Sequence, residues 1–289
     1  MRVVVTGATG MLGRDVVSSA TARGHDVTAL SRADLDITDL AATTVALAQA
    51  GGDVVINCAA WTDVDGAESQ EAAAFAVNAT GAGNVASAAA LAGAAVVHVS
   101  TDYVFDGSKS TPYLESDATA PIGAYGRTKL AGELAVAAIG ERHAIVRTAW
   151  LFGLGGSNFV ETMLRLGGER DEVSVVGDQI GCPTWTLDLA EALISVAERG
   201  TSGVLHAAGS DPCSWFEFAS EIFDRAEIDC DLKETTTKAF PRPAQRPAWS
   251  VLGSQRQDGI TLGSWRESLG QYLVQRQKTQ TNTTNGAQR

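Results

Sequence analysis

The chain has 289 residues, 45% of them hydrophobic, and a formal net charge of −12. This length and composition can bury one large core or two unequal ones. The acidic balance argues against nucleic acid or an anionic membrane as a partner, because both need a basic face. No apolar stretch is long enough to span a membrane, and the opening residues read as a strand rather than a signal peptide. We therefore expect a cytoplasmic protein.

Short apolar runs alternate with longer alanine-rich stretches of helical period over the first half of the chain. The predicted helices cover residues 11–24, 39–51, 68–93 and 125–140, and the predicted strands cover 2–7, 26–30, 53–60, 95–101 and 144–150. The strands are nearly continuous in apolar residues, which is typical of strands covered by helices on both faces. This order predicts an α/β fold with a doubly wound, Rossmann-like parallel sheet.

The regular alternation of predicted strands and helices ends near residue 150. Helices are predicted over 158–169, 186–200 and 214–226, with a short strand over 203–209. The pattern indicates a dinucleotide-binding domain over 1–150, with a returning segment near 184–206, and a smaller C-terminal α/β substrate domain over 151–276. Residues 277–289 lack an apolar period and are predicted to form a disordered tail.

The residue types that bind transition metals are scattered. No two cysteines form a C-x-x-C pair, and the histidines are equally far apart: Cys58, Cys182, Cys213 and Cys230; His25, His98, His143 and His206. Free, reduced thiols and no metal site are the expectation. No Mg²⁺ ligands can be assigned from the sequence.

The first strand leads into a glycine-rich turn. The stretch "VTGATGMLG" places Gly7, Gly10 and Gly13 in a G-x-x-G-x-x-G spacing between a strand and a helix, with Met11 and Leu12 inside it. Glycine permits the tight turn and leaves room for a pyrophosphate at the exposed N–H groups of the helix. In this strand–turn–helix context, the spacing predicts a dinucleotide site at these five residues.

Three later segments are expected to complete that site. Arg32 stands after the second strand, where NAD-binding proteins usually carry a carboxylate, and a guanidinium suits the 2′-phosphate of NADPH. The alternative is a solvated surface arginine. Asp36 and Ile37 are placed to flank the adenine, and the small Ala59 and Ala60 follow the third strand where the cofactor must pass.

A threonine, a tyrosine and a lysine form the predicted catalytic group. Thr101 ends the fourth strand, and Tyr125 and Lys129 lie one helical turn apart in "AYGRTKLAGELA". The lysine ammonium is expected to lower the pKa of the phenol, which then serves as an acid. Such a pair alone is more often an ordinary surface pair. Gly126 and Gly132 predict close approach of this helix to a neighbour, since propensity disfavours both.

The glycine turn and the tyrosine–lysine pair resemble motifs of a known protein family. The N-terminal T-G-x-x-G-x-x-G and the Y-x-x-x-K pair resemble the extended short-chain dehydrogenase/reductase family, and "STDYVFDG", "PIGAYGRTKLAGE", "RTAWLFG", "DQIGCPTW" and "PRPAQRPAWSVL" resemble its dTDP-4-dehydrorhamnose reductases. The resemblance covers nearly the whole chain before the tail. It implies hydride delivery from NADPH or NADH to the C4 ketone of dTDP-4-dehydro-6-deoxy-L-mannose, with Thr101, Tyr125 and Lys129 as catalytic residues and Tyr125 as proton donor.

The resemblance also suggests substrate contacts. An anionic dTDP-sugar needs arginines, and Arg242 and Arg246 in the proline-rich segment are the candidates, with an exposed solubilising loop as the alternative. Trp150 corresponds to a family aromatic near the sugar, or packs at a strand end. Asp102 and Tyr103 are expected to contact the sugar. Some relatives are described with Mg²⁺ at a dimer contact, so a homodimer is considered but not assigned.

Two other functions remain open. An epimerase or dehydratase of the same family would use the same cofactor and tyrosine, but a dehydratase usually carries a glutamate at the position of Tyr103. Without that acid, loss of water has no evident proton donor. Arg32 counts against an epimerase that retains NAD. The rival of another class is a non-catalytic regulatory subunit like that of methionine adenosyltransferase, which the intact sugar-binding stretches disfavour.

Overall fold

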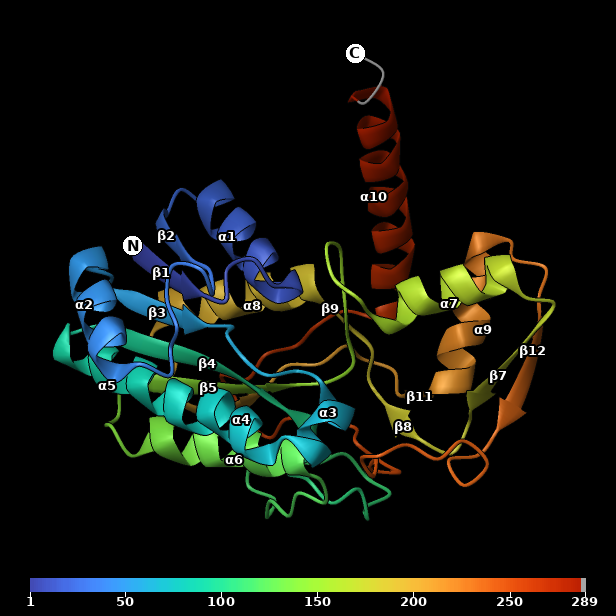
Figure 1. The fold of residues 1–289 in the computed structure, drawn as a ribbon, viewed down its shortest axis with the longest axis horizontal. Coiled ribbons are helices and arrows are strands. Elements are labelled where there is room, and N and C mark those ends of the chain that lie inside the picture. Colours follow the sequence, from blue (N-terminus) through green and yellow to red (C-terminus); the bar gives the residue numbers. More distant parts are fainter. Residues whose placement is uncertain (287–289) are drawn as a thin grey trace.

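The structure is a computed structural model that describes the backbone of residues 1–286 and the side chains of residues 1–280. A large sheet with helices on both faces lies beside a smaller group of helices and short strands (Figure 1). The strands are β1 (Arg2–Thr6), β2 (Asp26–Leu30), β3 (Val54–Asn57), β4 (Ala95–Thr101), β5 (His143–Thr148), β6 (Leu151–Phe152), β7 (Glu172–Val176), β8 (Ile180–Gly181), β9 (Thr184–Trp185), β10 (Gly203–His206), β11 (Cys213–Ser214) and β12 (Asp231–Thr235). The helices are α1 (Met11–Ala22), α2 (Leu40–Ala50), α3 (Val64–Ser69), α4 (Glu71–Phe75), the π-helix η1 (Ala76–Gly81), α5 (Ala82–Leu91), the 3-10 helix η2 (Asp102–Val104), α6 (Ala124–Ala137), α7 (Phe159–Glu169), α8 (Thr186–Arg199), α9 (Trp215–Ala226) and α10 (Trp265–Gly286). No helix over residues 1–286 combines the length and apolarity that crossing a membrane requires.

The main sheet is parallel throughout, in the order β10-β5-β4-β3-β1-β2. The five strands predicted from the apolar runs of the first half are all present, and β10, which lies within the short strand predicted over 203–209, adds a sixth at one edge. Parallel strands need crossover connections, and α1, α2, α5, α6 and α8 supply them. The predicted α/β fold with a doubly wound sheet is therefore confirmed.

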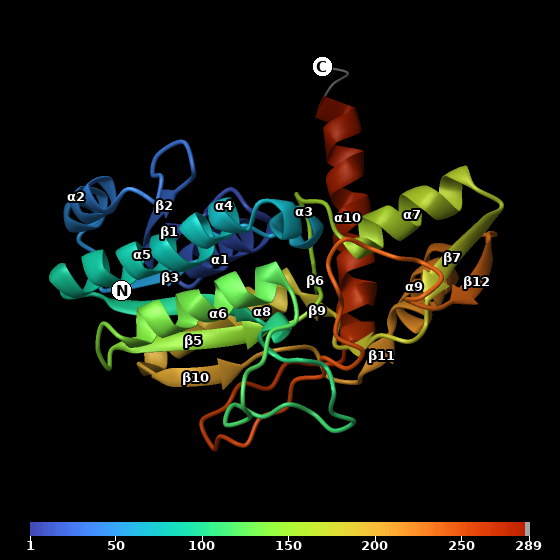
Figure 2. The same cartoon turned by 60° about the horizontal axis from the view of Figure 1, so that its bottom comes forward.

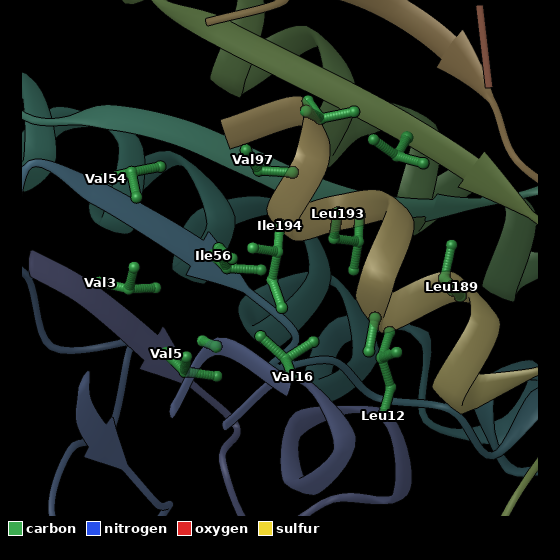
Figure 3. Close-up of a cluster of buried hydrophobic side chains, with 14 of the residues drawn as sticks. Val3, Val5, Leu12, Val16, Val54, Ile56, Val97, Leu189, Leu193 and Ile194 are labelled. Atoms are coloured by element: carbon green, nitrogen blue, oxygen red, sulfur yellow. The ribbon is translucent and has the colours of Figure 1, made fainter. Parts of the chain in front are cut away.

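Alternate residues of each strand enter opposite cores. Val3 and Val5 point into one core with α1 and α8, as Figure 3 shows, whereas Val4 faces α2 and α5 on the other side. Val55 on β3 faces the second core, between neighbours that face the first. Two covered faces explain why these strands read as unbroken apolar runs.

The two glycines of α6 lie where other backbone segments approach it. A Cβ at Gly126 would overlap the carbonyl oxygen of Tyr103, and one at Gly132 would overlap that of Asn78 in η1. The prediction that these glycines permit close approach is confirmed. The π-helical turn brings the backbone of η1 against α6 at this point, and Asn78 Nδ2 donates to Thr128 Oγ1 over 3.1 Å.

The smaller group has its own apolar core. Strands β7 and β12 pair in parallel, α7 and α9 pack against them, and Phe218, Trp265 and Tyr272 are buried among these elements. Figure 2 shows the loop between η2 and α6 beside the segment that joins β12 to α10. Tyr113 and Leu252 form a bridge between these two segments, so the C-terminal chain returns to the edge of the main sheet.

The last helix is longer than the sequence predicts. A disordered tail was expected over residues 277–289, but α10 continues to Gly286. Its first turns are anchored by the buried Leu269 and Tyr272, and the polar residues that follow include no proline, so the helix can propagate from a stable start. Residues 287–289 of the predicted tail lie outside the described residues.

Candidate active site

The glycine turn sits at the carboxyl edge of the main sheet. Gly7 has φ +68, and a Cβ there would come within 2.7 Å of the backbone nitrogen of Ala59. A Cβ at Gly13 would overlap the carbonyl oxygen of Gly7. Two of the three glycines are therefore required by the turn itself and by the passage of the Ala59–Ala60 segment beside it.

The first turn of α1 suits an anion. Gly10 is the N-cap and has no side chain that could accept from the helix N–H groups, and the first turn carries no acidic residue. A pyrophosphate can therefore take those donors. Met11 is half-buried, whereas the side chain of Leu12 packs in the core. Only the backbone of Leu12 can serve the predicted cofactor site.

The remaining predicted cofactor residues lie at the end of β2, beside this turn. Ala8 donates its backbone N–H to the carbonyl oxygen of Leu30 over 3.1 Å, which joins the turn to that strand. Arg32 is exposed two residues further on. Asp36 accepts from the backbone N–H and hydroxyl of Thr38 at 3.0 and 2.8 Å, and Ile37 is 5% exposed in the core. The cofactor roles of these residues stay predictions.

Thr101, Tyr125 and Lys129, the predicted triad, meet at the end of β4. Thr101 is the last residue of this strand, and Tyr125 lies in the first turn of α6 with Lys129 one turn later. The Tyr103 ring contacts that of Tyr125 edge to face, with centroids 5.5 Å apart. Thr101 Oγ1 accepts from the backbone N–H of Tyr103 over 3.2 Å. Thr101 and Tyr125 are joined by a side-chain hydrogen bond, and Lys129 Nζ is bonded to the carbonyl oxygen of Val99 on the same strand as Thr101.

The electrostatics of this group differ from the expectation. Burial raises the pKa of Tyr125 to about 12, a hydrogen bond with Thr101 opposes the rise, and Asp102 adds to it. Burial also lowers the pKa of Lys129 to about 8. Its Nζ donates to the carbonyl oxygen of Val99 over 2.7 Å. The expectation that the ammonium lowers the phenol pKa is wrong, because burial of the phenol raises its pKa and the amine is bonded to a main-chain carbonyl of β4.

Among the described side chains, three buried polar atoms around the predicted triad lack a hydrogen-bond partner. They are Asp102 Oδ2, His98 Nε2 on β4, and the hydroxyl of Thr148, which pairs in register with Thr101 across β4 and β5. Asp102 is 1% exposed, and burial raises the pKa of its carboxyl to about 6. Its other oxygen accepts from the Thr101 hydroxyl over 3.0 Å. Unsatisfied buried groups are uncommon in folded chains and are expected where a ligand completes them.

The predicted arginines share one carboxylate. Arg246 NH1 lies 2.9 Å from Asp65 Oδ1, and Arg242 NH1 lies 3.7 Å from Asp65 Oδ2. The side chain of Arg246 is 17% exposed and that of Arg242 is 56% exposed. Arg246 and Asp65 both act on the pKa of Tyr103, in opposite directions. Arg246 therefore lies near Tyr103, whose ring contacts that of Tyr125, and Arg242 is the more exposed of the two arginines.

Trp150 has an unusual backbone and an aromatic partner. Its φ is +48, a left-handed conformation that bulky residues rarely adopt. Its ring stacks on that of Trp215, the first residue of α9, with centroids 3.4 Å apart and planes 4° apart. A Cβ at Gly181 would overlap the Trp150 ring. The indole is thus clamped between β8 and α9, at the junction of the large and small groups of elements.

The sequence reasoning missed several residues of this region. Asp65, Trp215, Glu133 and Arg147 were not singled out. An arginine inside the apolar run "AIVRTAW" was an available signal, because a charge in a strand covered on both faces needs a buried partner. Asp65 and Trp215 gave no such signal, since both pair with residues far away in the chain. No group of three or more metal-binding side chains occurs over the described side chains.

Comparisons with known proteins show the family of this chain. The model of the RmlD substrate binding domain family matches residues 1–278. The dTDP-4-dehydrorhamnose reductase of Mycobacterium tuberculosis (strain ATCC 25618 / H37Rv) is 47% identical over 283 residues, which cover 94% of this chain and 92% of that protein. The solved dTDP-4-dehydrorhamnose reductase of Clostridium acetobutylicum has a TM-score of 0.93 at 43% identity and covers 96% of this chain and 100% of its own. That of Bacillus anthracis str. Ames, solved in complex with NADP, has a TM-score of 0.92 at 38% identity, with coverage of 95% and 99%. This chain therefore belongs to the RmlD substrate binding domain family.

Proposed function

We propose that this chain is an NAD(P)H-dependent oxidoreductase that reduces the C4 ketone of dTDP-4-dehydro-6-deoxy-L-mannose, or dTDP-4-dehydrorhamnose, to dTDP-L-rhamnose. Relatives with this name match almost the full length of the chain. The observation that supports the proposal is that Thr101 hydrogen-bonds Tyr125, and Lys129 bonds to Val99 of β4, at the sheet edge that also bears the glycine turn.

The cofactor would lie along the carboxyl edge of the main sheet. Its pyrophosphate would take the N–H groups at the start of α1, and Arg32 would meet a 2′-phosphate if the cofactor is NADPH. Asp36 and Ile37 would flank the adenosine, and Ala59 and Ala60 leave room for its passage. When bound, a reduced nicotinamide supplies the hydride that C4 receives.

Tyr125 would deliver the proton to the C4 oxygen. A phenol whose pKa is about 12 keeps its proton throughout the neutral range, so the donor is loaded before each turnover. A sugar alkoxide is a stronger base than a phenolate and still takes that proton. Thr101, which hydrogen-bonds the phenol, would orient the carbonyl oxygen, and a charged Lys129 would stabilise the phenolate that remains.

The substrate would be held by the elements that approach this edge from the small group. Arg246 would bind the diphosphate, with Arg242 at the rim. Asp65 holds Arg246 in place before the ligand arrives. The free oxygen of Asp102 would accept from a sugar hydroxyl, and Tyr103 and Trp150 would form apolar walls.

The experiment mixes the purified chain with dTDP-4-dehydro-6-deoxy-L-mannose and follows reduced-nicotinamide absorbance with NADPH and NADH separately. NMR of the product should show a new hydroxyl at C4 of an L-rhamnosyl nucleotide. Loss of absorbance without that product would contradict the proposal. Sedimentation of the same sample tests the homodimer, which predicts twice the 30.1 kDa mass of one chain.

The alternative family activities give different results in this assay. An epimerase regenerates its cofactor within each cycle and consumes none, and a dehydratase likewise shows no net consumption. Tyr103, rather than an acid, follows Asp102 in η2, which leaves the dehydratase chemistry without its usual proton donor. Stoichiometric consumption of NADPH or NADH by the keto-sugar therefore separates a reductase from both.

A further inference from the structure

A buried ion pair lies directly behind the predicted triad. Arg147 on β5 donates to Glu133 on α6 through two bonds, Nε to Oε1 at 2.9 Å and NH2 to Oε2 at 2.7 Å. The two side chains are 5% and 4% exposed. This bidentate geometry fixes the direction as well as the distance between helix and strand.

The same carboxylate also reaches β4. Ser100 Oγ donates to Glu133 Oε1 over 2.6 Å, and Ser100 pairs in register with Arg147. Ser100 directly precedes Thr101, and Glu133 lies one helical turn beyond Lys129 on the same face of α6. One carboxylate therefore joins the strand and the helix that carry the predicted triad.

Neutral groups surround the Arg147 end of the ion pair. Arg147 NH1 lies 3.5 Å from His206 Nε2, and its guanidinium lies over the ring of Phe105 at 5.1 Å from the centroid. His206 Nδ1 lies 2.8 and 3.1 Å from the carbonyl oxygens of Gly253 and Tyr113, so this nitrogen holds the ring proton. Burial and the charge of Arg147 lower the pKa of His206, which leaves it uncharged at neutral pH.

Stability alone does not account for this arrangement. Desolvating two charges costs several kcal/mol per ion, and apolar residues of equal volume often replace such pairs without loss. Glu133 lies on α6 and bonds to β4, the two elements that bear the predicted triad. This position suits a role in catalysis as well as in stability. We propose that Glu133 is a positioning residue of the reductase: it holds Tyr125 and Lys129 at a fixed place relative to Thr101, and it places a negative charge one helical turn from Lys129. The inference rests on the proposed function, because the triad has no role without it.

The groups around Lys129 support the electrostatic role of Glu133. Within the described side chains, Glu133 acts on Lys129 from α6, Cys58 from the end of β3, and His98 lies near it on β4. Burial raises the pKa values of Cys58 and Tyr125 to about 12 and lowers that of His98, so these three are neutral near pH 7. Glu133 is the charged neighbour and raises the pKa of Lys129, which burial holds at about 8.

The main test removes the charge without leaving its partner unpaired. Glu133→Gln alone strands the Arg147 charge and can unfold the chain. The double variant Glu133→Gln/Arg147→Met keeps the volumes and the neutrality of the site. We expect kcat to fall ~10–100-fold, KM to change less, and the alkaline limb of the pH–kcat profile to move down by about 1 pH unit or more. A folded double variant with the wild-type kcat and alkaline limb overturns the proposal.

Ser100→Ala tests positioning separately from charge. It keeps both ions and removes only the bond between the carboxylate and β4, so kcat should fall while the alkaline limb stays in place. An unchanged kcat in this variant overturns the positioning role. Glu169→Gln is the matched control, because it breaks a pair with Arg165 on α7 that is more than half exposed, and it should leave both readouts unchanged.

A titration of Lys129 without substrate tests the electrostatic role of Glu133 separately from the proposed catalytic function. The chain has five lysines, Lys109, Lys129, Lys233, Lys238 and Lys278, so NMR of labelled lysine side chains can follow the titration of Lys129 directly. The double variant should titrate at lower pH than the wild type. If the wild type does not reduce the keto-sugar but this shift appears, the proposed function fails while the electrostatic role stands. If the shift is absent, that role is wrong.

Discussion

The cofactor side and the sugar side of the candidate site are built in different ways. On the cofactor side, Gly7 and Gly13 are constrained by backbone atoms of their own turn and of the Ala59 segment. On the sugar side, Arg246 is held by Asp65 and Trp150 by Trp215, residues that are far apart in the chain. The geometry of the cofactor side depends on positions where the backbone requires glycine. The geometry of the sugar side depends on pairs of partly exposed side chains.

The difference separates chemistry from recognition. Groups fixed by backbone contacts cannot adapt to a ligand, which suits a cofactor and a proton donor that must be held in one geometry. Pairs such as Arg246 with Asp65 can exchange one partner for a phosphate at a modest cost. We therefore expect substitutions near α6 to act on kcat and substitutions on the sugar side to act on KM.

The largest effect is expected at Tyr125. Tyr125→Phe removes the proton donor and should lower kcat by ~10²–10⁴-fold, the range that general acid catalysis contributes, with cofactor affinity unchanged. Stopped-flow absorbance and cofactor titration measure the two quantities. Tyr113→Phe is the control, since that hydroxyl donates to Asp106 and not to a residue of the predicted triad. A Tyr125→Phe enzyme with near-normal kcat would exclude the assignment.

The next effect comes from the backbone contact of α6. A Cβ at Gly126 overlaps the carbonyl oxygen of Tyr103, so Gly126→Ala should move Tyr125 away from Thr101 and lower kcat by roughly 100-fold. Gly168→Ala on α7 meets no atom within 4 Å and should leave kcat near wild type. Equal kcat values for the two variants would show that the close approach does not position the phenol.

A smaller effect is expected at the arginines, and it should appear in KM. Arg246→Ala removes a charge-assisted contact of about 1.5–3 kcal/mol and should raise KM by about 10-fold or more. Arg242→Ala should raise it less, because Arg242 is mostly exposed and lies farther from Asp65. Steady-state kinetics with both variants tests the order, and a larger effect from Arg242 would reverse the assignment of the diphosphate contact.

The smallest effect on turnover is expected at Asp102, where stability gives the clearer signal. The folded pKa, about 6, lies above the ordinary value of 3.8, so proton binding contributes stability that is present below about pH 4 and lost as pH rises through 6. At pH 7.5, Asp102→Asn should therefore raise the free energy of unfolding by about 3 kcal/mol. Urea unfolding at pH 7.5 and pH 4 checks this, and a gain that is equal at both pH values would contradict it.

Most of the fold could be predicted from local patterns. The valine-rich strands, the glycine turn and the helix spacing of Tyr125 and Lys129 depend on residues close together in the sequence. The length of α10 was mispredicted because a polar helix that extends a buried one has no apolar period of its own. Periodicity reports the faces that are buried and is silent on helices that project into solvent.

The site was predictable where its chemistry is local and not where it depends on distant pairs. Asp65 and Trp215 acquire their roles only when remote segments meet. The pKa of Tyr125 was predicted in the wrong direction, because spacing identifies the lysine beside it but not the burial that raises its pKa. Glu133 was visible as an acid one turn beyond Lys129, but its partner on β5 could not be inferred from α6 alone.

The most direct test of the account is a crystal structure of this chain with NADP⁺ and dTDP-L-rhamnose bound. The account predicts that the C4 oxygen lies about 2.6–3.2 Å from both Tyr125 Oη and Thr101 Oγ1, with the nicotinamide ring against C4. A complex in which the phenol points away from C4, toward solvent or into the packing around Tyr103, would contradict the assignment of Tyr125 as proton donor.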